Sequence, residues 1–178
     1  ALAATDPDRA ARLLADAERI AQAPTSEPFK DMTFPAIAKA LAATDPDRAE
    51  RIAQSITIDS SKASALSGIA KALAATDPDR AARLLADAER IAQTITSEDS
   101  QASALADIAR ALVATDPDRA ERVAQSITSN APAHWKAGAL ADIAEALAAT
   151  DPDRAERVAQ SITDDSWKAT ALVMIVEA

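Results

Sequence analysis

The segment Ala-Thr-Asp-Pro-Asp-Arg-Ala carries the residues of this chain that are best suited to chemistry. Each copy places two carboxylates one residue apart, as in a metal-binding or acid/base pair. It occurs without change at residues 4–10, 43–49, 75–81, 114–120 and 149–155. A calcium ion needs six to eight oxygen ligands, and two carboxylates in each separate copy do not supply them. We therefore interpret the repeated carboxylates as structural, and we expect neither a metal nor another cofactor.

The remaining catalytic residue types are scarce. His134 is the only histidine, and the chain contains no cysteine. These residues provide neither a catalytic triad nor a zinc site with cysteine ligands. We therefore predict that the chain is not an enzyme. His134 lies beside Pro132 and Trp135, where we expect a role in the surface or in loop packing.

Composition and charge restrict the fold and the partners. Four residues are aromatic and two are glycine, whereas alanine is abundant, which favours helices over sheets. The net charge of −9 argues against nucleic acid as a partner. No apolar run approaches the ~20 residues that span a bilayer, so we expect no membrane partner. Because the N-terminus does not resemble a signal peptide, we expect a cytoplasmic location.

The spacing of the repeated segment indicates a tandem repeat. Its threonine falls at positions 5, 44, 76, 115 and 150, so successive copies are 39, 32, 39 and 35 residues apart. The two longer units gain seven residues, Ala11–Ala17 and Ala82–Ala88, and seven residues make about two helical turns. An insertion of this size lengthens a helix without rotating its apolar face, so we predict alternating long and short helices.

Each repeat is predicted to contain two helices, A and B. Helix A is exemplified by Gln101–Ala114, where Leu105, Ile108, Ala109 and Leu112 recur at the spacing of one helical face. Helix B follows the repeated segment, whose first Asp is suited to the N-cap and whose Pro is suited to the first helical position. The predicted caps are Asp6, Asp45, Asp77, Asp116 and Asp151. The second Asp then meets the positive end of the helix dipole.

We predict an all-α fold of about ten helices without a sheet, over one repeat array that comprises the whole chain. The expected units are a partial repeat at 1–23, full repeats at about 29–57, 61–96, 100–128 and 134–163, and a final partial repeat at 167–178. One helical hairpin cannot bury both of its apolar faces, whereas stacked hairpins form an α-solenoid. The two partial repeats suggest a piece of a longer array.

The repeat resembles the tetratricopeptide-like family of helical hairpins. The family pattern W-x2-L-G-x2-Y is matched in size by Leu105, Ile108, Ala109 and Leu112, and the small residue of helix B by Ala120. The resemblance implies a right-handed superhelix and a scaffold that binds proteins or peptides without catalysis. A HEAT-like arrangement of stacked helices is the near alternative.

If helix A lines the concave face, as the resemblance implies, a row of variable residues points into a groove. The candidate partner-binding residues are Lys39, Lys71, Arg110, Glu145, Met32, Ser64, Ser67 and Ser103. The row is basic in its first half, which suits an acidic peptide or a C-terminal carboxylate. An ordinary solvated helix face is the alternative interpretation.

Two further positions carry structural expectations. Trp135 and Trp167 occupy the same place in their repeats, and we expect them to pack in the first turn of helix A against the neighbouring helix B. Phe29 occupies this place in the first full repeat. Pro35 removes a backbone N–H donor, so we predict that its helix begins at about Thr33 or Phe34 and that residues 24–32 are irregular.

We expect a non-catalytic scaffold for a protein or peptide. Two alternatives stay open. The array is a structural spacer or self-associates head to tail through its cut ends, or it is the sensor region of a larger enzyme whose catalytic domain lies elsewhere. A bound peptide would favour the scaffold, and a mass that depends on concentration would favour self-association.

Overall fold

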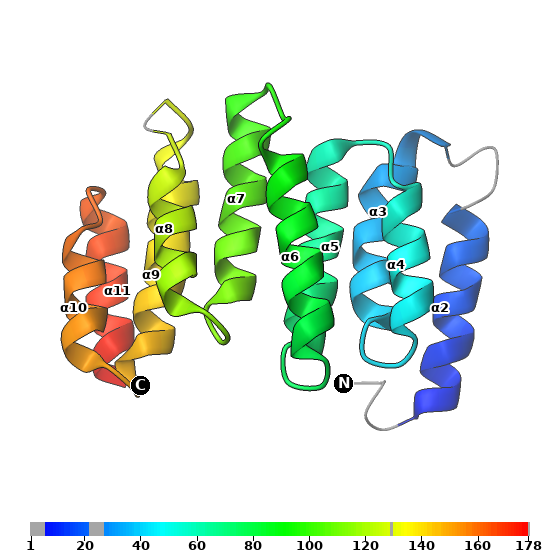
Figure 1. Ribbon diagram of the computed structural model, residues 1–178, viewed down its shortest axis with the longest axis horizontal. Coiled ribbons are helices and arrows are strands. Elements are labelled where there is room, and N and C mark those ends of the chain that lie inside the picture. The colour runs from blue at the N-terminus through cyan, green and yellow to red at the C-terminus, as the bar shows by residue number, and fades with distance from the viewer. Residues whose placement is uncertain (1–5, 22–26, 129, 178) are drawn as a thin grey trace.

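The protein is all-α over the residues that the computed structural model describes, 6–21, 27–128 and 130–177. Ten helices account for this part of the chain (Figure 1). They are α2 (Pro7–Ala21), α3 (Glu27–Leu41), α4 (Pro46–Ser55), α5 (Asp59–Leu73), α6 (Pro78–Ala92), α7 (Glu98–Leu112), α8 (Pro117–Ser126), α9 (Ala133–Ala148), α10 (Pro152–Gln160) and α11 (Asp165–Glu177). No strand occurs within these described ranges.

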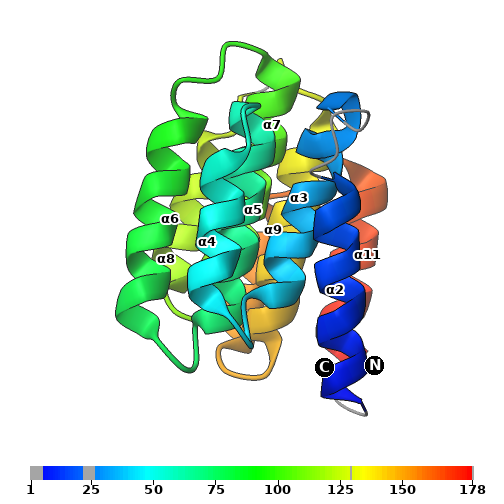
Figure 2. The ribbon, with the colours of Figure 1, turned by 90° about the vertical axis from the view of Figure 1, so that its right-hand side faces the viewer.

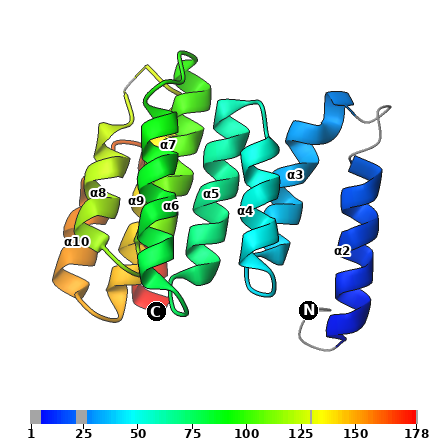
Figure 3. The same cartoon turned by 45° about the vertical axis from the view of Figure 1, so that its right-hand side comes forward.

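The helices form hairpins that lie side by side in chain order. The A helices α3, α5, α7, α9 and α11 form a continuous row in which each packs against the next. The B helices α4, α6, α8 and α10 each pack against the A helices before and after them. Figure 2, which looks along the long axis, separates α4, α6 and α8 from α5, α7 and α9. Figure 3 shows the successive hairpins from the side.

Small residues fill most of the space between the two rows. Alanine supplies more than half of the buried apolar positions, and Leu66, Ile69, Ile108 and Ile143 are the large side chains at the centres of the A helices. Alanine allows close helix packing because its side chain adds little to the distance between axes. The alternation of large and small residues along helix A therefore explains how successive hairpins share one core.

The repeated segment begins each B helix in the same way. At α6, for example, the carboxylate of Asp77 accepts the backbone N–H of Arg80 at 3.0 Å, and Pro78 is the first helical residue. Asp6, Asp45, Asp116 and Asp151 make the equivalent hydrogen bond in their own copies. The backbone N–H of Asp77 donates in turn to the carbonyl of Leu73, the last residue of α5. One segment thus ends helix A and caps helix B.

The long and short B helices that the spacing predicts are present. The helices α2 and α6 have 15 residues each, whereas α4 and α8 have 10 and α10 has 9. After each long helix the next hairpin is displaced along the helix axis. In Figure 1, α4 begins higher than α2, and α8 begins higher than α6. The seven inserted residues lengthen the helix by about 10 Å. They therefore determine both the length of the B helix and the axial displacement of the next hairpin.

The prediction for Pro35 is wrong. Pro35 lies inside α3, which is helical from Glu27, so residues 27–32 are not irregular; residues 22–26 lie outside the described part of the chain. An interior proline costs one hydrogen bond and a steric clash, about 3 kcal/mol. Burial of Phe34, Ile37 and Leu41 against the neighbouring helices offsets this cost. Tertiary packing thus overrides the local preference.

Both tryptophans contact the preceding A helix, and their expected packing against helix B stays a prediction. The indole N–H of Trp135 donates to Asp99 of α7 at 2.8 Å, and its ring lies 4.5 Å from the ring of His134. The ring of Trp167 lies over Gly138 of α9. The side chain of Phe29 lies outside the described residues.

Candidate functional site

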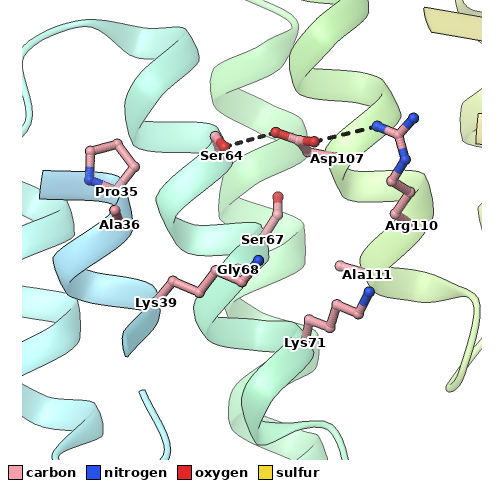
Figure 4. A pocket seen from close by; sticks show the side chains of 10 residues that line it. All are labelled: Pro35, Ala36, Lys39, Ser64, Ser67, Gly68, Lys71, Asp107, Arg110 and Ala111. Atoms are coloured by element: carbon pink, nitrogen blue, oxygen red, sulfur yellow. Dashed lines mark hydrogen bonds and ion pairs between the residues drawn. The ribbon is translucent and has the colours of Figure 1, made fainter. Parts of the chain in front are cut away.

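A hollow of about 260 Å³ lies on the exposed side of the A row, across α3, α5 and α7. Pro35, Ala36 and Lys39 contribute from α3, and Ser64, Ser67, Gly68 and Lys71 from α5, while α7 adds Asp107, Arg110 and Ala111 (Figure 4). Three successive hairpins therefore build one site. Five of the eight partner-binding residues predicted from the sequence meet here: Lys39, Lys71, Arg110, Ser64 and Ser67.

Two lysines supply the uncompensated positive charge of this hollow. Lys39 and Lys71 are both exposed, and neither has an ion-pair partner among the described residues. Gly68 lies between them on α5, and a Cβ atom placed there would meet the aliphatic part of Lys39 at 3.4 Å. The equivalent positions of α7 and α9 carry Asp107 and Asp142. Gly68 therefore leaves this position of α5, beside Lys39 and one turn before Lys71, without the carboxylate that its counterparts carry.

Arg110, the third predicted cation, is already paired. Its guanidinium contacts Asp142 of α9 and lies 3.5 Å from Asp107 one turn earlier on α7. Asp107 also accepts the hydroxyl of Ser64 at 2.7 Å (Figure 4). Sequence reasoning missed both aspartates. The spacing of Asp107 and Arg110, three residues apart on one helix face, was the available signal.

A second hollow continues the first along the same helices. It is lined by Asp31, Met32, Pro35, Ser60, Ser61, Ser64 and Ser103, so the two hollows share Pro35 and Ser64. The predicted residues Met32 and Ser103 therefore border this adjoining part. Ser67 is buried and donates to the carbonyl of Ala63, which places its hydroxyl within the helix wall. Glu145 is exposed on α9 and lines neither hollow.

The arginine of the repeated segment has a role that the sequence did not reveal. In each of four copies it contacts a glutamate of the preceding B helix. The closest contacts are Arg48–Glu18 at 2.5 Å, Arg80–Glu50 at 2.5 Å, Arg119–Glu89 at 2.9 Å and Arg154–Glu121 at 3.1 Å. We call this set the arginine ladder. It links consecutive B helices, which otherwise make little direct contact.

Where the preceding B helix is short, the ladder arginine contacts a second carboxylate. Arg80 also contacts Asp47, and Arg154 also contacts Asp118, both at 2.6 Å. Hydrogen bonds to Glu50 and then to Asp47 raise the pKa of Arg80 above its ordinary value. Because a raised pKa in the folded state stabilises the fold at every pH below the unfolded value, the contribution of Arg80 is constant across the physiological range.

The described residues were searched for clusters that could hold a metal ion. Among them, no three His, Cys, Asp or Glu side chains gather closely enough to hold a metal ion. His134 is exposed beside Trp135 and belongs to neither hollow. Within the same residues, no helix combines the length and the hydrophobicity that crossing a membrane requires.

The comparisons with known proteins assign no family to this arrangement. No protein-family model, no curated protein and no solved structure matches the chain.

Proposed function

We propose that the chain is a non-catalytic scaffold that binds an acidic peptide segment along α3, α5 and α7. The observation that carries the proposal is the pair of unneutralised lysines, Lys39 and Lys71, beside Gly68 in a hollow built by three hairpins. The chain as a whole is strongly acidic, with a net charge of −9. A local basic hollow on such a surface selects a ligand whose negative charge is concentrated at one point.

The proposal includes a finer description of the fold. The hairpins are units of a right-handed α-solenoid of the tetratricopeptide-like kind, and the A row is its ligand-binding face. The continuous packing of α3, α5, α7, α9 and α11 supports this description. The variable residues of the repeat lie on that row, whereas the repeated segment forms the turns.

The length and the direction that we propose for the ligand rest on the two hollows. They extend along α5 from Ser60 to Lys71. Eleven helical residues rise about 16 Å, which is the length of roughly five extended peptide residues. The acidic group lies at the lysine end, and Ser60, Ser61 and Ser103 offer hydroxyl groups to the peptide backbone at the other end.

Binding of labelled peptides tests this function. The probes are octapeptides of alternating Glu and Ser, with a free or an amidated C-terminus, and a Lys/Ser octapeptide of the same length. We expect the Glu/Ser peptides to bind and the Lys/Ser peptide not to bind. The double variant K39E/K71E reverses the local charge, and we expect it to weaken binding of the Glu/Ser peptides at least about tenfold, since each lost charge contact costs about 1 kcal/mol or more.

Two variants separate the site from the overall charge. R51E/R83E makes the same change in net charge on the exposed side of α4 and α6, and it should leave binding unchanged. G68D introduces the carboxylate that α7 and α9 carry at this position, and it should abolish binding while helicity is retained. Equal binding by the wild type, K39E/K71E and G68D would refute the proposal.

A further inference from the structure

Another hollow lies away from the peptide site, at the start of α9. Its volume is about 200 Å³, and three segments surround it: the loop after α8, the first two turns of α9 and the residues that follow α10. The buried side chains of Ala137, Leu140 and Ile162 form an apolar floor. Thr128 and Thr163 are exposed at the rim, and neither hydroxyl group has a hydrogen-bond partner among the described residues. We call this space the α9 hollow.

Lys136 supplies the charge of the α9 hollow. Its ammonium group donates to the carbonyls of Gln125 and Ile127, at 2.8 and 3.3 Å, and so satisfies two carbonyls at the end of α8. It has no ion-pair partner among the residues that the structure describes. In α7 the equivalent residue is Gln101, whose neutral amide donates to two carbonyls at the end of α6, at 3.1 and 3.2 Å. Capping of the B helix therefore does not require the positive charge of Lys136.

Other A helices provide a carboxylate at this place, and α9 does not. The helices α5, α7 and α11 each begin with an acidic residue, whereas α9 begins with Ala133. In α5 this acid is Asp59, three residues before Lys62, the counterpart of Lys136. Residues three apart lie on the same face of a helix. Ala133 lines the α9 hollow, so the hollow lies where the other helices carry their own carboxylate.

A longer loop forms one wall of the hollow. Eight residues separate Ile127 from Lys136, whereas five separate the equivalent residues Ile56 and Lys62. Ala131 belongs to the longer loop, and its buried side chain lines the hollow. The additional length therefore contributes to the site, together with the replacement of the acidic residue by Ala133.

We propose that the α9 hollow binds a small carboxylate with a short apolar chain. The ligand carboxylate lies beside Lys136, in the place of the Asp side chain of α5, and the hydroxyl groups of Thr128 and Thr163 supply further donors. The apolar chain covers Leu140 and Ile162. Since a water molecule takes about 30 Å³ of the liquid, a hollow of 200 Å³ accommodates about seven non-hydrogen atoms. The branched acid 3-methylbutanoate is of this size and serves as the probe.

Titration of the isotope-labelled chain with 3-methylbutanoate, followed by NMR, tests this site. We expect saturable shifts of the backbone amides around Lys136, Ala137 and Thr163, with a Kd of about 1 mM, as is usual for so small a ligand. The neutral probe 3-methylbutanamide has the same shape without the charge. It should bind at least about tenfold more weakly, because the ammonium group of Lys136 favours an anion. Shifts that do not saturate, or equal binding of the two probes, would overturn the proposal.

Two variants copy residues that other repeats carry at the same positions. K136Q introduces the glutamine of α7, which keeps a capping donor and removes the charge, and A133D introduces the carboxylate with which α5 and α11 begin. Each should weaken binding of 3-methylbutanoate at least about tenfold, while the thermal denaturation midpoint stays near that of the wild type. K62Q makes the same change in net charge on α5 and should leave binding unchanged. Wild-type affinity in K136Q or in A133D would rule out this position for the ligand carboxylate.

The same chemistry occurs at the C-terminus of a peptide that ends in an apolar residue. The peptide Gly-Gly-Gly-Leu distinguishes this source from a free acid, with its amidated form as the control. Tighter binding of the free-ended peptide than of 3-methylbutanoate identifies a peptide C-terminus as the ligand, and the opposite order identifies a free small acid. The acidic-peptide site is separate, because Lys39 and Lys71 lie outside the α9 hollow. K39E/K71E should therefore bind 3-methylbutanoate as the wild type does.

Discussion

At the residue scale, each internal copy of the repeated segment contacts three helices. Its first Asp caps the B helix that follows, its backbone closes the A helix that precedes, and its Arg contacts the B helix of the previous repeat. Each role uses a different part of the segment. This division accounts for the recurrence of the first Asp and of the Arg, although no residue of the segment lines the two hollows.

The cap contributes a measurable part of the stability. Replacement of Asp77 by Ala leaves the N–H of Arg80 without its acceptor, and we expect the free energy of unfolding to fall by about 1 kcal/mol. D77N is the matched control, because Asn caps a helix about as well as Asp does. Urea denaturation followed by circular dichroism measures the difference. Equal losses in D77A and D77N would show that the negative charge matters and the cap does not.

The two glycines should respond differently to a Cβ atom. Alanine is favoured over glycine in a helix interior by about 0.5–1 kcal/mol. At Gly68 the new Cβ lies 3.4 Å from the flexible side chain of Lys39, so G68A should stabilise the fold by about this amount. At Gly138 it lies 3.1 Å from the guanidinium of Arg110, which is held by Asp142.

G138A should therefore gain less than G68A, or lose stability, because Arg110 must move away from its partner. Thermal denaturation of the two variants beside the wild type measures both effects. A larger gain for G138A than for G68A would contradict this account of the Arg110 contact.

At the element scale, the length of a B helix determines where the next hairpin lies. After a short helix, the ladder arginine reaches a glutamate near the start of the preceding B helix, as in Arg80–Glu50. After a long helix, it reaches one near the end, as in Arg119–Glu89. The seven-residue insertion moves this glutamate by two turns, so the ion pair follows the step and the apolar face keeps its orientation.

Deletion of residues 82–88 from α6 tests this relation. The remaining sequence, PDRAERIAQ, begins as α4 does and keeps the glutamate that Arg119 contacts. We expect a folded chain of lower stability, because the burial of Leu84 and Leu85, about 1.5–3 kcal/mol each, is lost. Circular dichroism and urea denaturation measure the outcome.

A deletion of five residues, 82–86, serves as the control. Five residues rotate the rest of the helix by about 140° from its original orientation, whereas seven leave it within about 20°. The shorter deletion should therefore destabilise the chain more than the longer one. If stability simply falls with the number of residues removed, register does not control the packing of α6.

Comparison of these elements shows which features can be read from a single sequence. Helix identity, the cap at Asp77 and the two helix lengths depend on neighbouring residues, and the sequence predicts them. The Arg80–Glu50 contact joins residues 30 positions apart, and the Asp142 contact with Arg110 joins residues 32 apart. Such contacts require the axial offset of the hairpins, which no local pattern contains. The predicted start of the helix near Pro35 is wrong for the same reason, because the helix depends there on the packing of Phe34 against other elements.

At the scale of the whole molecule, the main helix contacts among the described residues run between neighbouring hairpins. Stability in such an array is approximately a sum of terms for each repeat and each interface. The central helices α5 and α9 have neighbours on both sides and many buried residues. In α11, by contrast, Ala171 is the only buried residue among those described. We therefore expect local stability to be lowest at the ends.

Hydrogen exchange of backbone amides measures this gradient. The amides of α11 should exchange at least about tenfold faster than those of α5, because opening the last helix breaks one side of the array only. Equal exchange in all helices would instead show that the array opens as one cooperative unit, with no independent end repeat.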